Sequence, residues 1–198
     1  QELRNCLAKW KVRMALREMA ALLSFKTATG NSISDTRMDA QELALRYIFF
    51  RFHYKKGAIK KYTGNMDLDL DEFVDLLNKM GDFEFDKYVS EFDSSMKSAR
   101  HLFGRHAFRK VFVDTVKDSP RSLVNKAIFV SWSVLLADYD YNKIKKSIEK
   151  YSFVSILGEK ITTDLDYYRA LSYGTNGRWN ILKAFEVAEE LIKSNISE

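Results

Sequence analysis

The sequence DAQELALRYIFFRFHYKKGAIKKYTGNMDLDLDEFVDLLNKM, residues 39–80, decides the fold. An apolar stripe at steps of three and four residues, the spacing of one helix face, runs through its first half: Leu43, Tyr47, Phe50 and Tyr54. Gly64-Asn65 then marks a turn. A second stripe of the same kind closes the stretch: Phe73, Leu76, Leu77 and Met80. The pattern predicts two helices that form a helical hairpin.

Two acidic pairs predict where these helices begin. Asp39 stands three residues before Glu42, and Asp69 stands three residues before Glu72. This is the capping-box spacing, in which two side chains satisfy backbone N–H groups at a helix start. We therefore expect helices that begin at Asp39 and at Asp69.

The composition extends the helical prediction to the whole chain. The 198 residues are 46% hydrophobic and 30% charged, which is typical of a globular protein. One proline and eight glycines are few for a protein built from strands and turns. No internal repeat or linker-like segment divides the chain. We expect an all-α protein, with residues 1–198 in a single compact bundle of about seven to nine helices.

Further helices are predicted on both sides of the central stretch. Helical spacing from Leu3 continues to about Leu23, and residues 26–37 are polar enough for a loop. A long amphipathic helix covers residues 85–103 and ends at Gly104. The last helix carries one apolar stripe: Ile181, Phe185, Ala188 and Ile192.

Three other boundaries are predicted less directly. Ser119 and Pro120 are typical of a helix start, so a helix from Arg121 to Ala137, apolar almost all round, is placed at the centre of the core. Residues 153–157 are compatible with a helix or a short strand that ends at Gly158. Thr163 is expected to cap the next helix.

Positive charge is concentrated in two segments. The first basic segment, residues 43–66, and the second basic segment, residues 94–113, contain no acidic residue. Between them, the acidic segment, residues 67–93, holds ten acidic residues. Basic side chains attract phosphate, and interleaved aromatic rings can stack on bases. The candidate phosphate contacts are Arg46, Arg51, Lys55, Lys56, Lys60 and Lys61 in the first segment, and Arg100, Arg105, His106, Arg109 and Lys110 in the second. Alternatively, these cations are solvated or pair with the acidic segment.

The sequence offers no catalytic constellation. Asp67, Asp69 and Asp71 alternate like calcium-loop ligands, but Glu72 stands where the loop needs glycine. The three histidines lack the spacing of a metal or nuclease signature, and residues 174–177 lack the ending of a P-loop. Cys6 is the single cysteine, which excludes an internal disulfide and a cysteine-rich zinc site. We expect a non-enzymatic chain without a cofactor or metal of its own.

The most apolar run, residues 127–137, is too short to span a bilayer. There is no signal peptide, and one cysteine fits a reducing compartment, so we expect a cytoplasmic protein without a membrane partner. Nothing in the sequence specifies an oligomeric state.

Six segments, in order, carry a resemblance to a known family: QELRNCL (1–7), RMDAQELALRYIFF (37–50), YTGNMDLDLDEFVDLLNKM (62–80), FGRHAFRK (103–110), VNKAIFVSW (124–132) and SYGTNGRW (172–179). They resemble the C-terminal helical part of the family of uncharacterised function that forms the N-terminal half of GmrSD-type, modification-dependent restriction endonucleases. The resemblance runs through nearly the whole chain.

The resemblance implies a phage-defence protein with two separable activities. One is an NTP-binding part, ParB/sulfiredoxin-like, with an Asp-Gly-Gln-Gln-Arg motif upstream of the helical region. The other, when present, is a C-terminal His-Asn-His nuclease. This chain contains neither motif. We therefore expect a fragment that lacks the NTP-binding half, to which any NTP or divalent metal would belong.

Two functions follow as hypotheses. The first is a non-catalytic helical module of a restriction protein, with DNA phosphate or its own NTP-binding half as the partner of its basic faces. The second is a purely structural or protein-interaction domain that does not bind nucleic acid.

Overall fold

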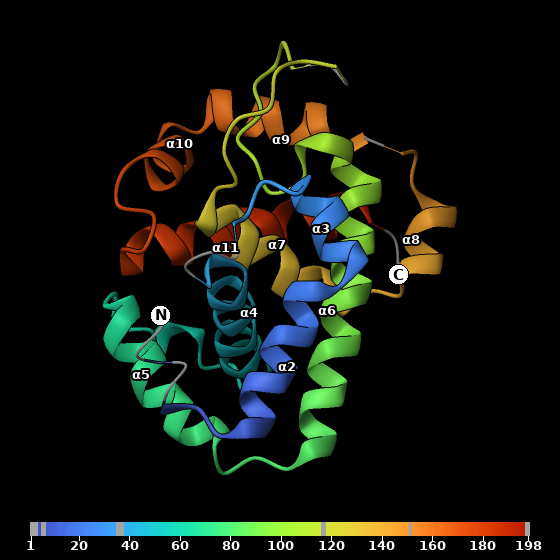
Figure 1. The fold of residues 1–198 in the computed structure, drawn as a ribbon. Coiled ribbons are helices and arrows are strands. Elements are labelled where there is room, and N and C mark those ends of the chain that lie inside the picture. The colour runs from blue at the N-terminus through green and yellow to red at the C-terminus, as the bar shows by residue number, and fades with distance from the viewer. Residues whose placement is uncertain (1–3, 5–6, 35–37, 116–117, 151, 197–198) are drawn as a thin grey trace.

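The structure is a computed structural model that describes residue 4 and residues 7–34, 38–115, 118–150 and 152–196. These residues form ten α-helices and two short 3₁₀ helices, with no β-strand among them, which confirms the all-α prediction (Figure 1). The elements in chain order are α2 (Trp10–Ala21), α3 (Leu23–Thr29), α4 (Asp39–Lys55), η1 (Ile59–Lys61), α5 (Met66–Leu77), α6 (Asp82–Phe103), η2 (Gly104–His106), α7 (Lys126–Leu136), α8 (Tyr141–Ser147), α9 (Ser152–Thr163), α10 (Leu165–Ser172) and α11 (Arg178–Asn195).

Helix α7 lies at the centre, as its apolar sequence predicts. Every residue from Ala127 to Leu136 is buried. The helix packs against α4, α6, α10 and α11 (Figure 1). Its large rings contact those of its neighbours; Trp132 packs edge-on against Phe103 of α6, with ring centroids 4.8 Å apart. Buried apolar side chains from all ten helices join this centre in one continuous cluster.

The central hairpin is held together by aromatic rings. Phe49 of α4 packs edge-on against Phe73 of α5, with centroids 5.3 Å apart. Tyr62, after η1, closes the gap between the helices, packing 5.2 Å from Phe50. Burial raises the pKa of Tyr62 to about 12, so its hydroxyl stays protonated and donates to the carbonyl of Asn176.

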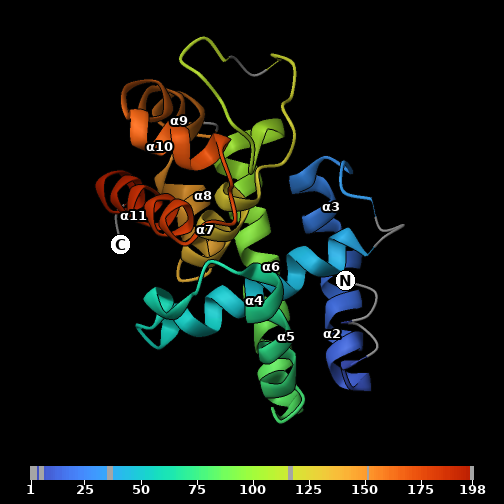
Figure 2. The same ribbon diagram turned by 90° about the vertical axis from the view of Figure 1, so that its left-hand side faces the viewer.

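Helix α6 is the longest element and supports two sides of the molecule. Helices α2 and α3 pack along one side, and α7, α8 and α9 contact it elsewhere (Figures 1 and 2). The extended residues on both sides of positions 116–117 project beyond the helices at the top of both views. This arrangement places the end of α6, which carries much of the second basic segment, between α3 and α8.

The predicted start of α4 is confirmed, since the helix begins at Asp39, but Asp39 is not its cap. Met38, in a left-handed conformation, stands at the cap position, so Asp39 lies inside the first turn. The predicted start of α5 is wrong, because this helix begins three residues before Asp69, and the Asn65 side chain accepts from the backbone N–H of Leu68. Asp69 instead accepts from the hydroxyl of Thr63, at 2.7 Å. The carboxylate of Asp69 therefore bonds to the preceding turn and not to a helix end.

The predicted start of the central helix is also wrong. Helix α7 begins at Lys126, and its cap is Asn125, whose Oδ1 accepts from the N–H groups of Ala127 and Ile128. Asn125 also donates its own backbone N–H to the carbonyl of Phe108, at 2.8 Å. That bond, beside an isolated bridge between Arg109 and Val124, keeps the preceding residues extended.

Two further predictions need correction. The first helix breaks at Leu22, and α3 occupies part of the predicted loop, which takes the helix count above the predicted range. Residues 153–157 belong to α9, not to a strand, and the helix runs through Gly158. A Cβ at Gly158 would lie 2.6 Å from the carbonyl oxygen of Phe112, so glycine permits this close backbone approach. Asp164, not Thr163, caps α10.

In the part of the chain that the structure describes, no helix is long and apolar enough to cross a membrane. Cys6 and most of the residues of the segment 1–7 lie outside the described residues.

Candidate anion-binding cavity

A basic cavity of about 400 Å³ opens between α3, α6 and α8. We call it the basic cavity; its lining residues are Ser24, Thr27, Lys97, Arg100, His101, Tyr141, Lys145 and Lys150. Four of these side chains are Lys or Arg, and none is a carboxylate. Three hydroxyl groups complete the lining.

The helical repeat brings these side chains together. Lys97, Arg100 and His101 stand three and four residues apart, so they share one face of α6. The opposite face of α6 carries Met96 and Ala99, which are fully buried in the core. Because the apolar face packs in the core, the basic face is directed toward solvent.

Short helices supply the two other walls. Ser24 and Thr27 lie one turn apart on α3. In α8, Asp140 caps the first turn by accepting from the N–H of Lys143, and Ile144 is buried against the core. This anchoring turns Tyr141 and Lys145, one turn apart, toward the cavity.

The positive charge of the basic cavity is only partly compensated. Lys97 pairs with Asp93 on the same helix face, and Ser24 Oγ donates to that carboxylate at 2.7 Å. Among the described residues, neither Arg100 nor Lys145 forms an ion pair. Like charges that converge without a counter-charge raise the local potential and attract anions.

His101 joins the cavity to α8. Its Nε2 lies 3.2 Å from the carbonyl oxygen of Ile148, which follows α8, so this nitrogen carries the hydrogen and donates. The imidazole also packs edge-on against Tyr141, with centroids 6.5 Å apart. His101 thus holds the wall that carries Lys145.

The arrangement suits an oxyanion. Guanidinium and ammonium groups form short, charge-assisted hydrogen bonds with phosphate, and the hydroxyls can complete its coordination. Within the described residues, no group of three or more His, Cys, Asp or Glu side chains could hold a metal ion. The lining of the basic cavity therefore matches a negatively charged ligand better than a cation.

The arginines of the first basic segment lie inside the protein. Arg51 is 2% exposed, and its guanidinium pairs with Glu91 at 2.9 Å and with Asp138 at 2.6 Å. Burial alone would lower the pKa of Arg51, but hydrogen bonds to these carboxylates raise it above its ordinary value. Lys55 also pairs with Glu91.

Arg46 is similarly enclosed. It pairs with Glu42 at 2.7 Å and donates to Asn176 Oδ1, also at 2.7 Å, which ties α4 to the turn before α11. Burial would raise the pKa of Glu42, but the charges of Arg46 and Lys126 bring it below its ordinary value. The guanidinium groups of Arg46 and Arg51 therefore already have protein partners.

The other three candidates of the first segment are exposed. The Lys56 ammonium lies 3.9 Å from the centre of the Phe52 ring. Lys60 and Lys61 of η1 have exposed side chains without an ion pair among the described residues. These lysines lie at the end of α4, outside the basic cavity.

The structure separates the candidates of the second segment. Arg100 lines the basic cavity. Arg105 is half-buried, whereas His106 and Arg109 are each 2% exposed. Lys110 turns toward α10, where its Nζ lies 3.3 Å from Ser172 Oγ and 5.8 Å from the centre of the Tyr168 ring.

Sequence reasoning missed the lysines on the opposite wall of the basic cavity. Lys145 and Lys150 lie far from Arg100 in the chain, and no periodicity links them. A signal existed, because residues 143–150 contain four lysines: Lys143, Lys145, Lys146 and Lys150.

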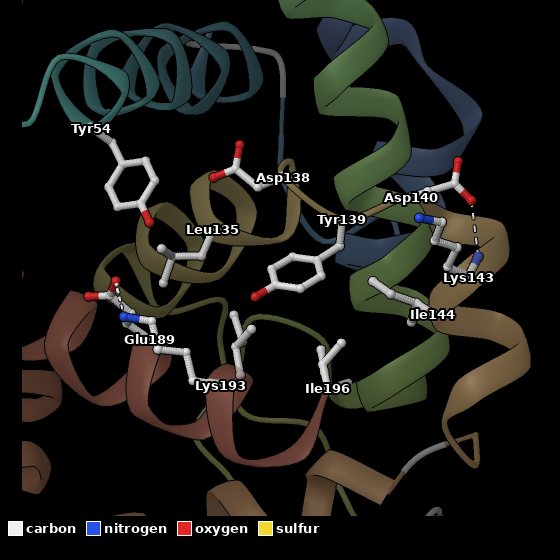
Figure 3. Close-up of a pocket in the computed structure, with 11 residues that line it drawn as sticks. Tyr54, Leu135, Asp138, Tyr139, Asp140, Lys143, Ile144, Glu189, Lys193 and Ile196 are labelled. Atoms are coloured by element: carbon white, nitrogen blue, oxygen red, sulfur yellow. Dashed lines mark hydrogen bonds and ion pairs between the residues drawn. The ribbon is translucent and has the colours of Figure 1, made fainter. Parts of the chain in front are cut away.

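A second cavity, of about 440 Å³, lies on the other side of α8 (Figure 3). Its apolar lining residues are Leu135, Ile144, Ile192 and Ile196. The rings of Tyr54 and Tyr139 also line it (Figure 3). Its charges are mixed; Glu189 pairs with Lys193 at 2.9 Å, and Asp138 pairs with Arg51. This mixed-charge cavity has no excess of one sign comparable to that of the basic cavity.

Comparison of the chain with family models, curated proteins and solved structures finds no match.

Proposed function

We propose that this chain is a non-catalytic helical module that contacts nucleic-acid phosphates through the basic cavity. The observation that carries the proposal is the convergence of Lys97, Arg100, Lys145 and Lys150 on a space lined by no carboxylate. Phosphate contacts supply most of the affinity and position a nucleic acid without reading its sequence. We further propose that the module belongs to a GmrSD-like restriction protein, whose NTP-binding half would be its partner.

The proposal is supported by the difference between the basic cavity and the rest of the charged surface. Arg100 and Lys145 come from different helices, and neither forms an ion pair among the described residues. Each is accessible, since Arg100 is half-buried and Lys145 is exposed. When unpaired cations of this kind neutralise DNA phosphates, the counterions condensed on the DNA are released.

The test measures binding of a fluorescent duplex DNA across a salt series. We expect measurable affinity at low salt that falls linearly on a logarithmic scale as salt rises. The double variant Arg100→Gln/Lys145→Gln should lower the magnitude of the slope by about 2, one for each phosphate contact removed.

The matched control is Lys60→Gln/Lys61→Gln, which removes the same charge from exposed lysines outside the cavity. We expect this variant to keep most of the wild-type slope. Equal losses in both variants would assign binding to general surface charge. Absence of binding at low salt would reject the proposal.

A second candidate function is a structural or protein-interaction domain. It is favoured by the ion pairs of Arg51 and Lys55 with Glu91, since Glu91 belongs to the acidic segment. On this hypothesis the basic segments stabilise the fold and contact no nucleic acid. Wild-type affinity for DNA in Arg100→Gln/Lys145→Gln, together with reduced stability, would favour it.

A further inference from the structure

A second group of cations lies beyond the basic cavity, where α3 and α6 end. We call Arg105, Arg109 and Arg121 the arginine cluster. Arg105 belongs to η2, Arg109 follows it, and Arg121 lies on the extended segment before α7. None of these residues lines the basic cavity.

Arg109 is the buried member of the arginine cluster, and its hydrogen-bond partners among the described residues are all neutral. Its Nη2 donates to the carbonyl of Thr29 at 2.6 Å and to Ser32 Oγ at 2.8 Å. Its Nη1 donates to the carbonyl of Ser122. Its Nε is buried and has no hydrogen-bond partner among the described residues.

Arg121, on the extended segment before α7, places its guanidinium beside Gly30, next to that of Arg109. Its Nη1 donates to the carbonyl of Gly30 at 3.4 Å. A Cβ at Gly30 would lie 2.0 Å from that Nη1 and 3.8 Å from Arg109 Nη2, so both guanidinium groups border one point. Gly30, with φ +65°, therefore leaves the space that Arg121 occupies.

The positive charge of the cluster lacks a full counter-charge. Within the described chain, none of the three arginines forms an ion pair with a carboxylate, in contrast to Arg4, Arg46 and Arg51. Burial lowers the pKa of Arg109, and the charges of Arg121 and Arg105 lower it further. The carbonyl end of α3 supplies only about half an elementary negative charge. A buried charge of this kind is stable only when it is paired.

We propose that the arginine cluster is a phosphate-binding site, with Arg105 and Arg121 as the direct contacts and Arg109 as the buried residue that positions them. Guanidinium groups suit this ligand because their planar donors match two phosphate oxygens at once. Arg121 is exposed and Arg105 is half-buried, so both can reach a ligand from solvent. The site stands on its own geometry and does not require the basic cavity to bind DNA.

The position of the arginine cluster suggests a common polyanion. Arg105 lies two residues after the end of α6, and Lys97 and Arg100 of the basic cavity lie near that same end of the helix. One nucleic-acid strand carries a phosphate for every ~3.4 Å of duplex axis, so its repeated phosphates suit cations that follow one another along α6. A free phosphorylated compound shares the same chemistry and is distinguished by experiment.

The test uses inorganic phosphate as the probe and the full chain. Arginine Nε–H signals in ¹⁵N-correlated NMR spectra are recorded during a phosphate titration, against sodium chloride of equal ionic strength. We expect saturable shifts of the Arg105, Arg109 and Arg121 signals that chloride does not reproduce. Arg105→Gln/Arg121→Gln should weaken phosphate binding at least tenfold, with the remaining Arg109 signal as the readout. Arg100→Gln/Lys145→Gln, with the same loss of charge, should leave the response of the three cluster signals unchanged.

The DNA titration of the same variants identifies the source of the phosphate. Loss of both phosphate and DNA affinity in Arg105→Gln/Arg121→Gln assigns the site to a nucleic-acid strand; loss of phosphate affinity alone assigns it to a free phosphorylated compound. Unchanged phosphate binding in this variant, or shifts equal to those in chloride, overturns the proposal. If Arg100→Gln/Lys145→Gln does not change DNA affinity, the proposed function is rejected. Phosphate binding by the arginine cluster is measured separately and does not depend on that outcome.

Discussion

The two basic segments have similar compositions and opposite structural roles. In the first, the arginines are enclosed and paired; Arg51 bonds to Glu91 and Asp138, and Arg46 bonds to Glu42. In the second, Arg100 faces an open cavity and Arg109 is buried against carbonyl groups, with no carboxylate bound to either among the described residues. The arginines of the first segment are thus neutralised by carboxylates, whereas, in the part of the chain that the structure describes, Arg100 and Arg109 of the second are not.

A basic run alone therefore does not identify a binding surface. The positions of the acidic partners decide whether a basic side chain is neutralised, and the partners of Arg51 lie 40 residues or more from it in the chain. Charge that the fold neutralises contributes to stability, whereas charge that the fold leaves uncompensated is available to a ligand. Substitutions in the two segments should therefore have different effects.

The largest expected effect is on Arg51. We expect Arg51→Gln to lower the free energy of unfolding by about 3 kcal/mol, because it removes a buried guanidinium that bonds to two carboxylates and two backbone carbonyls. Chemical denaturation followed by circular dichroism measures the change. Lys61→Gln, in the same segment but exposed, should change it by less than about 0.5 kcal/mol. Equal stability of the two variants would contradict the internal role of Arg51.

A smaller effect is expected for the Glu42–Arg46 pair. A double-mutant cycle with Glu42→Gln and Arg46→Gln should give a coupling energy of about 1 kcal/mol, since Arg46 is buried and Glu42 is mostly so. The exposed pair of Lys97 with Asp93 has the same spacing in the chain and serves as the control. Its coupling should be about 0.3–0.5 kcal/mol. A larger coupling energy for Asp93–Lys97 than for Glu42–Arg46 would contradict this prediction.

The basic cavity, to which Arg100 of the second segment contributes, should respond in the opposite direction. At low salt, Arg100→Gln/Lys145→Gln should raise the free energy of unfolding by up to about 0.5 kcal/mol, because it relieves repulsion between uncompensated cations. The gain should disappear at high salt, where the repulsion is screened. Denaturation at two salt concentrations measures it. A clear loss of stability would show that these cations have structural partners.

The smallest expected effect concerns pH. The pKa of Glu42 in the folded chain lies below the ordinary value of 4.5, so its ion pairs stabilise the fold above that pH. This contribution is lost as pH falls through the lowered pKa. Denaturation from about pH 6 to about pH 3 should show a stability loss that is smaller in Glu42→Gln by about 0.5 kcal/mol. An identical pH dependence of stability in the wild type and in Glu42→Gln would contradict a stabilising role for the ion pairs of Glu42.

Much of the fold could be predicted from apolar periodicity. The stripes of α4, α5, α6 and α11 are local patterns, so their helices follow from the sequence. Helix starts were less predictable, since acidic side chains at capping spacing have alternatives in three dimensions. Asp69 bonds to Thr63, and the extended residues before Asn125 are held by Phe108. These partners depend on the fold and leave no local signal.

The candidate site could be predicted only in part. Arg100 was found from charge segregation, and Arg105 and Arg109 belong to the arginine cluster. Lys145 and Arg121 were missed because their neighbours come from other helices and from an extended segment. No spacing rule connects such residues, since the contacts exist only after α3 and α8 have packed on α6.

Helix α8 separates two cavities, with Tyr141 and Lys145 in the wall of one and Lys143 and Ile144 in the wall of the other. Among the seven residues of α8 only Ile144 is buried, so a single side chain fixes this helix to the core. The helix therefore forms a thin wall between the two cavities. A shift of α8 would therefore alter the walls of both cavities at once. Ligands of the two cavities would be coupled through this helix, by the same factor in both directions.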